Sequence, residues 1–528
     1  MPAVLQLDRL SHVLPDGRML FSDLQFTFAP HRIGLVGDNG VGKSVLGRLL
    51  AGQHDSMHYV PQDLAPDRYP TVAALAGVAS VLAALDRIAA GSVEPDDYAL
   101  VGERWDVAAR LRQALDEIGL PHVGPETATL NLSGGERQRI ALQGAWLSQA
   151  DWLLLDEPSN HLDAQQRARL LAQMARWPRG LLLISHDRNL LAHVDQIVEL
   201  SAQGLRSYGG NYDVYAQQRI LEQAGFAAAL QSEKAGARRA QREAQQQMER
   251  QQKRVSRGER EGREGNQSKL LLDAKKEKSQ DSQGRLRLRA EQAQQVRRQR
   301  VLDASARCAP DAERLLLAPD SVVPNGKLLL ELRDLVLPHG SAQPLNLLLG
   351  GPQRLAVTGD NGSGKSTLLR VIAGQLAPVS GQLRCHARLA WLDQHAGGQD
   401  GDLSAIQRLQ ARNSVLAEGE LRTRLALLGM AGARATVPSR LLSGGERMKV
   451  ALAAELYAHT PPQLLLLDEP DNHLDLASLQ ALAHMLRLYR GALLVVSHDQ
   501  AFLQELLLDD QHLHLQPGAH GRCHKATL

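Results

Sequence analysis

Four short motifs occur twice in this chain, in the same order and at nearly the same spacing. A glycine-rich loop of the form GxxxxGKS begins at Gly37 and again at Gly359, 322 residues further along. LSGGER, LLLDEP and SHD follow each loop, and their second copies lie 310, 312 and 312 residues after the first. A repeat that keeps order and spacing indicates two duplicated domains rather than chance matches.

Apolar runs predict how each half folds. The chain has 528 residues, 43% of them hydrophobic, which is enough for about three domains with substantial cores. Runs at 32–36, 152–155 and 181–184 predict buried strands of a largely parallel sheet. Helices are expected after the first glycine-rich loop, at 43–51, and after the first LSGGER, at 136–148. Strands that alternate with helices in this way indicate a three-layer α/β fold.

A different kind of sequence separates the halves. Between Glu233 and Arg300 there are 20 Lys/Arg and 10 Asp/Glu, a local charge of +10 in a chain whose net charge is +2. We expect two helices, at 215–255 and 270–306, each roughly 50–60 Å long and joined by a glycine-containing tip. The predicted architecture is therefore two tandem phosphate-loop domains, at 1–215 and 326–528, joined by a basic α-helical hairpin linker at 216–325.

Composition excludes several other classes. The three cysteines are isolated and lack metal-ligand spacing, which fits a reducing compartment rather than a disulfide framework. Neither a signal peptide nor an apolar run of membrane-spanning length is visible, so we expect a cytoplasmic protein that is not inserted in a membrane.

The glycine-rich loops have the composition of a phosphate-binding site. Glycine lets backbone N–H groups surround phosphates, and the following helix presents its positive end to them. Lys43 and Lys365 supply cations for the β- and γ-phosphates, and Ser44 and Ser366 offer hydroxyl ligands to a metal. We expect ATP and Mg²⁺ as cofactors. The loop residues are Gly37, Asp38, Asn39, Gly40, Val41, Gly42, Lys43, Ser44 and Val45, with Gly359, Asp360, Asn361, Gly362, Ser363, Gly364, Lys365, Ser366 and Thr367.

Paired acids end one apolar strand in each half. Asp156 and Asp468 would place a carboxylate beside the metal. Glu157 and Glu469 follow immediately and could orient or deprotonate the attacking water. The pattern predicts an ATPase.

These motifs together resemble the ATP-binding cassette family in both halves. By that resemblance, Gln62 and Gln394 match the glutamine that contacts metal and water, and His186 and His498 match the switch histidine at the γ-phosphate. The family architecture implies a head-to-tail sandwich within one monomeric chain, in which each LSGGER loop closes over ATP bound to the other half. The loop residues concerned are Ser133, Gly134, Gly135 and Glu136, with Ser443, Gly444, Gly445 and Glu446. The implied metal ligands are Ser44, Gln62 and Asp156, with Ser366, Gln394 and Asp468.

The two halves differ in detail. Val45 occupies the position at which the second half has Thr367. The glutamine lies 25 residues after the first glycine-rich loop begins but 35 after the second, so a hairpin suggested at 379–392 is expected to be shortened in the first half. We predict two competent ATP sites, and whether they are equally active stays open at the level of sequence.

The SNHLD and DNHLD continuations, the paired cassettes and the charged linker resemble the ABC-F class, whose typical form is TNHLD. Ser159 and Asp471 replace that threonine. The resemblance implies binding to the ribosome, at ribosomal RNA and P-site tRNA, to regulate translation, rescue stalled ribosomes or protect against antibiotics. Linker-tip residues expected to contact RNA are Arg257, Arg260, Arg263, Asn266 and Lys269.

Two other functions stay open at the level of sequence. A basic hairpin does not encode RNA specificity, so a DNA-binding, repair-type ATPase of the same family is the first alternative. The second is an ATPase subunit that docks on separate membrane proteins. The linker composition also fits a solvated coiled coil that only joins the two domains.

Overall fold

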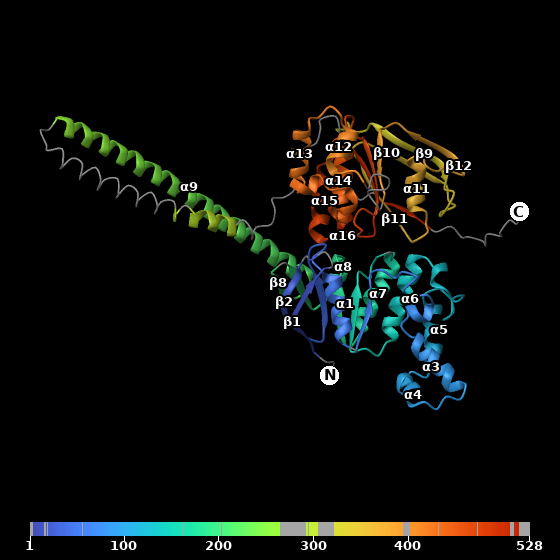
Figure 1. Ribbon diagram of the computed structural model, residues 1–528. Helices are drawn as coiled ribbons and strands as arrows, with labels where there is room; N and C mark the ends of the chain where they lie inside the picture. The colour runs from blue at the N-terminus through green and yellow to red at the C-terminus, as the bar shows by residue number, and fades with distance from the viewer. Residues whose placement is uncertain are drawn as a thin grey trace. The chain divides into compact units, whose positions relative to one another are not determined.

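The computed structural model describes residues 4–14, 17, 19–54, 56–160, 162–201, 203–264, 292–293, 295–304, 322–393, 402–430, 432–472, 474–506 and 512–516. It divides into two compact units. One unit comprises Met1–Asp213 with Ala312–Leu528 and holds both cassettes, and the other comprises Val214–Asp311 and holds the linker (Figure 1).

The first cassette is built on a six-stranded sheet in the order β4-β5-β6-β3-β7-β8. Its strands are parallel except β8, which pairs antiparallel with β7. The bounds are β3 Arg32–Val36, β4 Met57–Val60, β5 Trp152–Asp156, β6 Gly180–Ile184, β7 Gln196–Ser201 and β8 Gly204–Gly209. Every residue of β5 and β6 is buried, as their continuous apolar sequences require. A separate antiparallel pair, β1 Leu5–Val13 and β2 Met19–Phe28, contributes to the same core.

The second cassette repeats this plan with a parallel sheet in the order β13-β14-β15-β11-β16. Its strands are β11 Arg354–Gly359, β13 Leu389–Leu392, β14 Leu464–Asp468, β15 Ala492–Val496 and β16 His512–Leu515. A three-stranded antiparallel sheet, in the order β10-β9-β12, is formed by β9 Leu328–Val336, β10 Leu345–Gly350 and β12 Ser380–Cys385.

The hairpin expected at 379–392 is wrong, because its two strands belong to different sheets. β12 pairs with β9, whereas β13 pairs with β14 in the parallel sheet. Among the described residues, the antiparallel sheet of the first cassette has two strands where that of the second has three. The longer interval in the second cassette is therefore used to build an added strand.

A helix follows each of the four repeated motifs, and further helices lie between the glycine-rich loop and LSGGER of each cassette. Those of the first cassette are α1 Lys43–Gln53, α2 Val72–Leu75, α3 Ala79–Ala89, α4 Pro95–Val101, α5 Val107–Glu117, α6 Gly134–Leu147, α7 Ala164–Arg176 and α8 Arg188–Leu191. Those of the second are α11 Lys365–Ile372, α12 Ala405–Arg412, α13 Glu418–Leu427, α14 Gly444–Leu456, α15 Leu476–Leu488 and α16 Gln500–Leu506.

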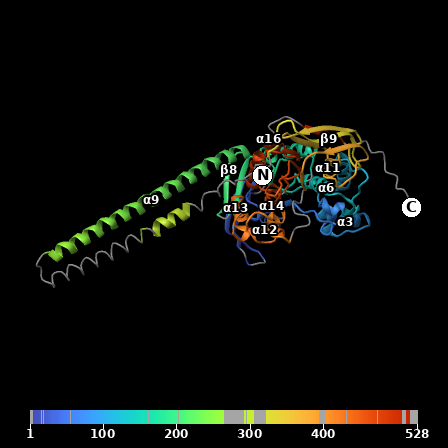
Figure 2. The same ribbon diagram turned by 90° about the horizontal axis from the view of Figure 1, so that it is seen from above.

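The linker begins with one long helix, α9 Tyr212–Glu264, of 53 residues, which is uninterrupted in Figure 1 and Figure 2. The expected end of this arm near Val255 is therefore wrong, because the helix continues through Gly258 and Gly262. A glycine inside a helix costs only about 1 kcal/mol, and the surrounding Arg, Glu and Gln are good helix formers. Of the second expected arm, residues 292–293 and 295–304 are described, and they are helical.

Candidate active site

Strand order gathers the motif residues at one edge of each sheet. In the first cassette, the strands that end in the acidic pair, in SHD and in the glycine-rich loop are β5, β6 and β3, which are neighbours. In the second cassette the corresponding neighbours are β14, β15 and β11. Because the carboxyl ends of parallel strands meet at the same edge, the three motifs converge there.

The first glycine-rich loop depends on two glycines whose φ angles are positive. Gly37 has φ 150°, and a Cβ there would lie 2.3 Å from the backbone oxygen of Leu200 in β7. Gly42 is the left-handed N-cap of α1, with φ 105°, and a Cβ there would lie 2.5 Å from Leu20. The α1 N-terminus has no side-chain cap and no acidic residue in its first turn. Its N–H groups are thus available to an anion.

The second loop repeats this backbone geometry. Gly359 has φ 144°, and a Cβ there would lie 2.3 Å from the backbone oxygen of Leu515, while Gly364 is the left-handed N-cap of α11 with φ 97°. The Ser363 hydroxyl is buried and has no hydrogen-bond partner in the described part of the chain. Both loops therefore carry unsatisfied polar groups where a phosphate would be bound.

A lysine ammonium lies inside the curve of each loop. Lys43 Nζ donates to the carbonyls of Gly37 and Asp38, at 2.7 and 3.1 Å, and Lys365 Nζ donates to those of Gly359 and Asp360, at 2.8 and 3.0 Å. Burial lowers the pKa of both lysines, although nearby carboxylates oppose the shift. The cations are held by carbonyl oxygens that a phosphate could replace.

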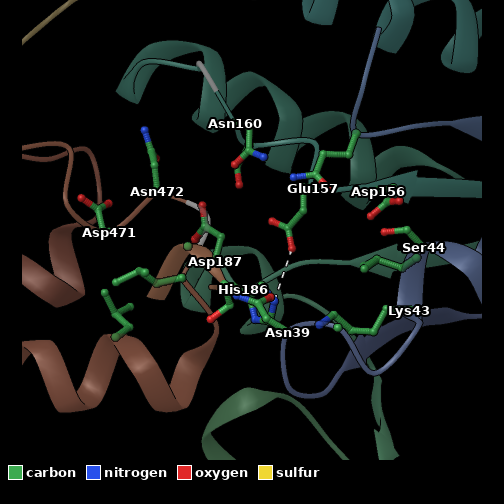
Figure 3. A pocket seen from close by; sticks show the side chains of 18 of the residues that line it. Asn39, Lys43, Ser44, Asp156, Glu157, Asn160, His186, Asp187, Asp471 and Asn472 are labelled. Carbon is green, nitrogen blue, oxygen red and sulfur yellow. Dashed lines mark ion pairs between the residues drawn. The ribbon is translucent and has the colours of Figure 1, made fainter. Parts of the chain in front are cut away.

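The strand-end aspartates are buried beside the loop serines. Burial raises the pKa of both Asp156 and Asp468. Ser366 Oγ donates to Asp468 Oδ1 at 3.1 Å, and the Tyr59 hydroxyl donates to Asp156 Oδ2 at the same distance. Tyr59 was missed from the sequence because β4 only becomes a neighbour of β5 through the sheet order. Asp156 Oδ1 has no hydrogen-bond partner among the described residues, and Figure 3 shows the Asp156 carboxylate next to Ser44.

The glutamates that follow these aspartates have a left-handed backbone. Glu157 has φ 49° and Glu469 has φ 48°, a region that costs a residue with a side chain roughly 1–3 kcal/mol. Each N–H still donates to the neighbouring strand, to Ile184 O at 2.8 Å and to Val496 O at 2.9 Å. Burial, together with Asp156, raises the pKa of Glu157 to about 8. Backbone strain of this kind is often found at functional sites, and its presence at the same position in both cassettes makes these glutamates candidate functional residues.

Each glutamate faces the histidine of the adjacent SHD motif. His186 Nε2 lies 3.7 Å from Glu157 Oε1, and His498 Nε2 lies 3.8 Å from Glu469 Oε1 (Figure 3 shows the first pair). Burial lowers the pKa of His186 to about 3 and that of His498 to about 4. Both imidazoles are therefore neutral at pH 7.

Lowering the pH from 7 to 5 is expected to destabilise the nucleotide-free protein. A histidine in the unfolded chain has a pKa of about 6.5. Between pH 7 and pH 5 both histidines therefore become protonated in the unfolded state, whereas in the folded state they stay neutral. Stability should rise with pH between about 4 and 6.5. At pH 5 each histidine should lower the free energy of unfolding by on the order of 2 kcal/mol relative to pH 7. Urea unfolding of wild type and His186→Gln/His498→Gln at both pH values measures this. An equal loss in the two proteins would contradict it.

The LSGGER motifs form helix N-termini. Ser133 and Ser443 each accept from the N–H of the glutamate three residues later, at 3.3 and 3.2 Å. Glu136 and Glu446 reach back to the serine N–H, at 2.7 and 2.9 Å. These are capping boxes on α6 and α14, which explains the serine–glutamate spacing.

One cavity brings residues of the two cassettes together. It has a volume of about 520 Å³ and holds Asn39, Lys43 and Glu157 on one side and Ser443, Gly444 and Asn472 on the other. Gln62, Val45 and His186 also line it. Figure 3 shows Asp471 and Asn472 approaching the side that carries Glu157 and Lys43. The second LSGGER loop thus lies at the first phosphate loop.

Direct contacts also cross between the cassettes in both directions. Asn39 N donates to Asp475 Oδ2 at 2.9 Å, and Asn361 N donates to Asp163 Oδ2 at 3.5 Å. The aspartate of each NHLD segment therefore contacts the phosphate loop of the other cassette. At the second loop the described contacts come from Asp163 and, at His498, from Arg167, rather than from Ser133–Glu136.

The other expected site residues lie either on the linker helix α9 or outside the described residues. Arg257 is exposed on α9, and Arg260 and Arg263 belong to the same helix. Gln394, Asn266 and Lys269 lie outside the described residues. In the described part of the chain, no helix combines the length and apolarity needed to span a bilayer.

The fold and the paired motif sites define a tandem ATP-binding cassette ATPase. The family model described as ABC transporter matches residues 21–160 and 342–472. The probable ATP-binding protein YheS of Escherichia coli (strain K12) is 32% identical over 94% of this chain and 76% of its own length. The tylosin resistance ATP-binding protein TlrC of Streptomyces fradiae is 31% identical over 95% of this chain and 96% of its own. The chain belongs to the ABC-F family of ATP-binding cassette proteins.

Further similarities extend this picture. ATP-binding cassette sub-family F member 3 of Rattus norvegicus is 30% identical over 90% of this chain, which spans 66% of that protein's length. A crystal structure of archaeal ribosomal stalk protein aP1 with archaeal ribosome recycling factor aABCE1 matches with a TM-score of 0.58 and 18% identity, over 96% of this chain and 86% of that one. A structure of RNase-L Inhibitor matches with a TM-score of 0.54 and 18% identity, over 92% and 86%. These two structures share the fold of the paired cassettes.

Proposed function

We propose that this protein hydrolyses ATP at two composite sites and uses the cycle to bind and leave the ribosome in the cytoplasm. The observation that carries the ATP part is the shared cavity, in which the first phosphate loop meets the second LSGGER loop. Closure of the cassettes over nucleotide would then be a step that ATP favours and hydrolysis reverses. The cellular role would be regulation of translation, rescue of stalled ribosomes or protection from an antibiotic, the last suggested by the name of the Streptomyces relative.

The acidic side of each site fits a magnesium ion. At the first site Asp156 has a buried oxygen with no hydrogen-bond partner among the described residues, its carboxylate lies beside Ser44, and Gln62 lines the same cavity. Ser366 and Asp468 form the matching pair at the second site, where Gln394 is the proposed third ligand. Hard oxygen ligands of this kind suit Mg²⁺, which would neutralise phosphate charge when bound.

The remaining side chains divide the chemistry of hydrolysis. Lys43 and Lys365 stabilise the negative charge that develops on the transferred phosphoryl group. Glu157 and Glu469 orient the attacking water and accept its proton, which suits the raised pKa of Glu157. The neutral His186 and His498 can each accept a hydrogen bond at one ring nitrogen and donate one at the other.

The helix α9 supports RNA as the partner. At 1.5 Å per residue its 53 residues extend for about 80 Å. Lys234, Arg238 and Arg242 are exposed and recur every four residues, so they form a stripe along one face. Exposed cations on a slender helix bind phosphates without reading sequence, and that affinity depends strongly on salt. Ribosomal RNA and P-site tRNA are the proposed ligands.

Neutralising this stripe is expected to weaken ribosome binding by about tenfold at 0.1–0.2 M salt. The variant is Lys234→Gln/Arg238→Gln/Arg242→Gln, and the measurement is cosedimentation with ribosomes over a salt series in the presence of ATP. Loss of three phosphate contacts should also reduce the salt slope by about two to three. ATP turnover of the isolated variant should stay at the wild-type rate.

The matched control neutralises three acids of the same helix, Glu233→Gln/Glu243→Gln/Glu249→Gln. It should bind as well as wild type or better, because it removes repulsion from phosphates. Equal sedimentation of both triple variants would contradict the RNA proposal. Duplex DNA that binds as tightly as ribosomes in a mobility shift would favour the repair-type alternative instead.

A further inference from the structure

Arg167, on the first turn of α7, connects the two histidine loops. Its Nη1 donates to Asp187 Oδ2 at 3.0 Å and to the backbone oxygen of His498 at 3.4 Å. Asp187 follows His186 of the first cassette, whereas His498 belongs to the second. The arginine side chain is 16% exposed and that of Asp187 is 6% exposed, so water competes little for these contacts.

The duplicated cassette lacks this arginine. With the 312-residue offset of the repeat, Arg167 corresponds to Leu479, which has no donor for the equivalent carbonyl of His186. The same offset matches Asp471 to Ser159. All four side chains line the cavity between the cassettes. At one of the two pseudo-equivalent places of the interface Arg167 occurs together with Asp471. At the other, Leu479 occurs together with Ser159.

Asp471 is the acidic residue that occurs together with Arg167. Its side chain is half-buried, and its solvent-inaccessible Oδ1 has no hydrogen-bond partner in the described part of the chain. Burial and the nearby Asp499 raise the pKa of Asp471 to about 7, and Ser497 and Arg167 oppose that shift. Arg167 forms an ion pair with Asp187, and its charge also acts on Asp471 and on Asp499, which Arg188 stabilises as well.

A second contact between the cassettes also has its cation in the first cassette and its acceptor in the second. Arg188 of the first cassette lies 2.5 Å from Glu505 of the second, and their repeat counterparts are Gln500 and His193. In both contacts the first cassette supplies the cation and the second supplies the oxygen acceptor. The cassette interface is consequently asymmetric, although the phosphate loops are alike.

We propose that Arg167 is a positioning residue that holds the His498 loop against the first cassette, so that hydrolysis at the second ATP site depends on a contact that the first site lacks. Asp187 supplies the main counter-charge that keeps Arg167 in place, and Asp471 adds to it. The first site depends less on Arg167, because Asp187 is also held as the N-cap of α8, where it accepts from Asn189 N at 2.9 Å. The proposal concerns ATP turnover alone and stands whether or not the ribosome is the partner.

Arg167→Leu, which copies Leu479, tests this in two backgrounds. Glu157→Gln leaves turnover at the second site, and Glu469→Gln leaves turnover at the first. We expect kcat to fall about tenfold in the first background and less than twofold in the second, with KM for ATP unchanged, because a hydrogen bond from a charged donor is lost. Arg167→Lys, which keeps a donor, should recover at least a third of the lost rate. Equal losses in both backgrounds, or no recovery with lysine, would overturn the proposal.

A second variant distinguishes the positioning role of Arg167 from a merely structural one. Arg167→Leu/Asp471→Ser recreates the Leu479–Ser159 pair, so it should fold with the wild-type melting temperature while the second site stays slow. If it restores kcat, Arg167 only balances charge and the positioning role is wrong. Arg169→Leu, at an exposed position of the same helix, is the matched control and should leave both sites at their wild-type rates.

Discussion

ATP turnover is expected to fall at least a hundredfold in the Glu157→Gln/Glu469→Gln variant, while ATP binding is retained. Glutamine keeps the shape of glutamate and its hydrogen bonds to water but cannot accept a proton, and general-base catalysis contributes typically about 10²–10⁴-fold. Each glutamate has a positive φ and an N–H bonded to the adjacent strand, so its carboxylate is directed into the site by the sheet itself. The measurement is steady-state phosphate release together with equilibrium ATP binding.

The single variants should each retain the turnover of one site. Unequal residual rates are expected because the environments differ, with Tyr59 donating to the first aspartate and Ser366 to the second. Glu117→Gln, on the exposed face of α5, is the control and should hydrolyse ATP like wild type. Turnover of the double variant above a tenth of the wild-type rate would show that these glutamates are not the bases.

Alanine at Gly37 or Gly359 is expected to abolish nucleotide binding at its own site. A Cβ at either position would lie 2.3 Å from a backbone oxygen of the neighbouring strand, and the φ angles of 150° and 144° are rarely adopted by a residue with a side chain. A backbone atom inside a sheet cannot move aside as a flexible side chain can. The loop must shift instead, which turns its N–H groups away from the phosphates, and ATP affinity at that site should fall at least a hundredfold.

The stability cost should be smaller than the effect on binding. Overpacking of this kind costs about 1–3 kcal/mol, which urea unfolding can resolve. Gly52→Ala is the matched control, because Gly52 lies in α1 with nothing within 4 Å of its added Cβ. It should bind ATP normally and gain up to about 1 kcal/mol from helix propensity. Wild-type ATP affinity in Gly37→Ala would contradict the strict requirement for glycine.

Much of the fold could be predicted because buried parallel strands are continuous apolar runs. The strand expected at 32–36 is β3 Arg32–Val36, and the acidic strand of the first half extends only one residue beyond the expected 152–155. The end of the first linker helix could not be predicted, because Gly258 and Gly262 suggest a break in the helix. Local propensity cannot show that the surrounding helix tolerates them, and α9 continues to Glu264.

The motif residues that line the candidate site can be picked out from the sequence, but their geometry cannot. Motif spacing identifies Glu157 yet says nothing of its positive φ, which arises where β5 ends beside β6. Tyr59 and Arg167 were not predicted, because each acts through an element that is distant in sequence and adjacent only in the fold. One available signal was overlooked. The serine–glutamate spacing within LSGGER is that of a capping box, and it would have predicted the starts of α6 and α14.

We propose that ATP held between the cassettes controls engagement of the ribosome. Cosedimentation of the Glu157→Gln/Glu469→Gln variant with ribosomes, in ATP and in ADP, tests it most directly. Slow hydrolysis should keep the cassettes closed, so ATP should raise the ribosome-bound fraction well above that of wild type, and ADP should not. Ribosome occupancy that equals wild type in ATP, or that is the same in ATP and ADP, would show that ATP closure does not control ribosome binding.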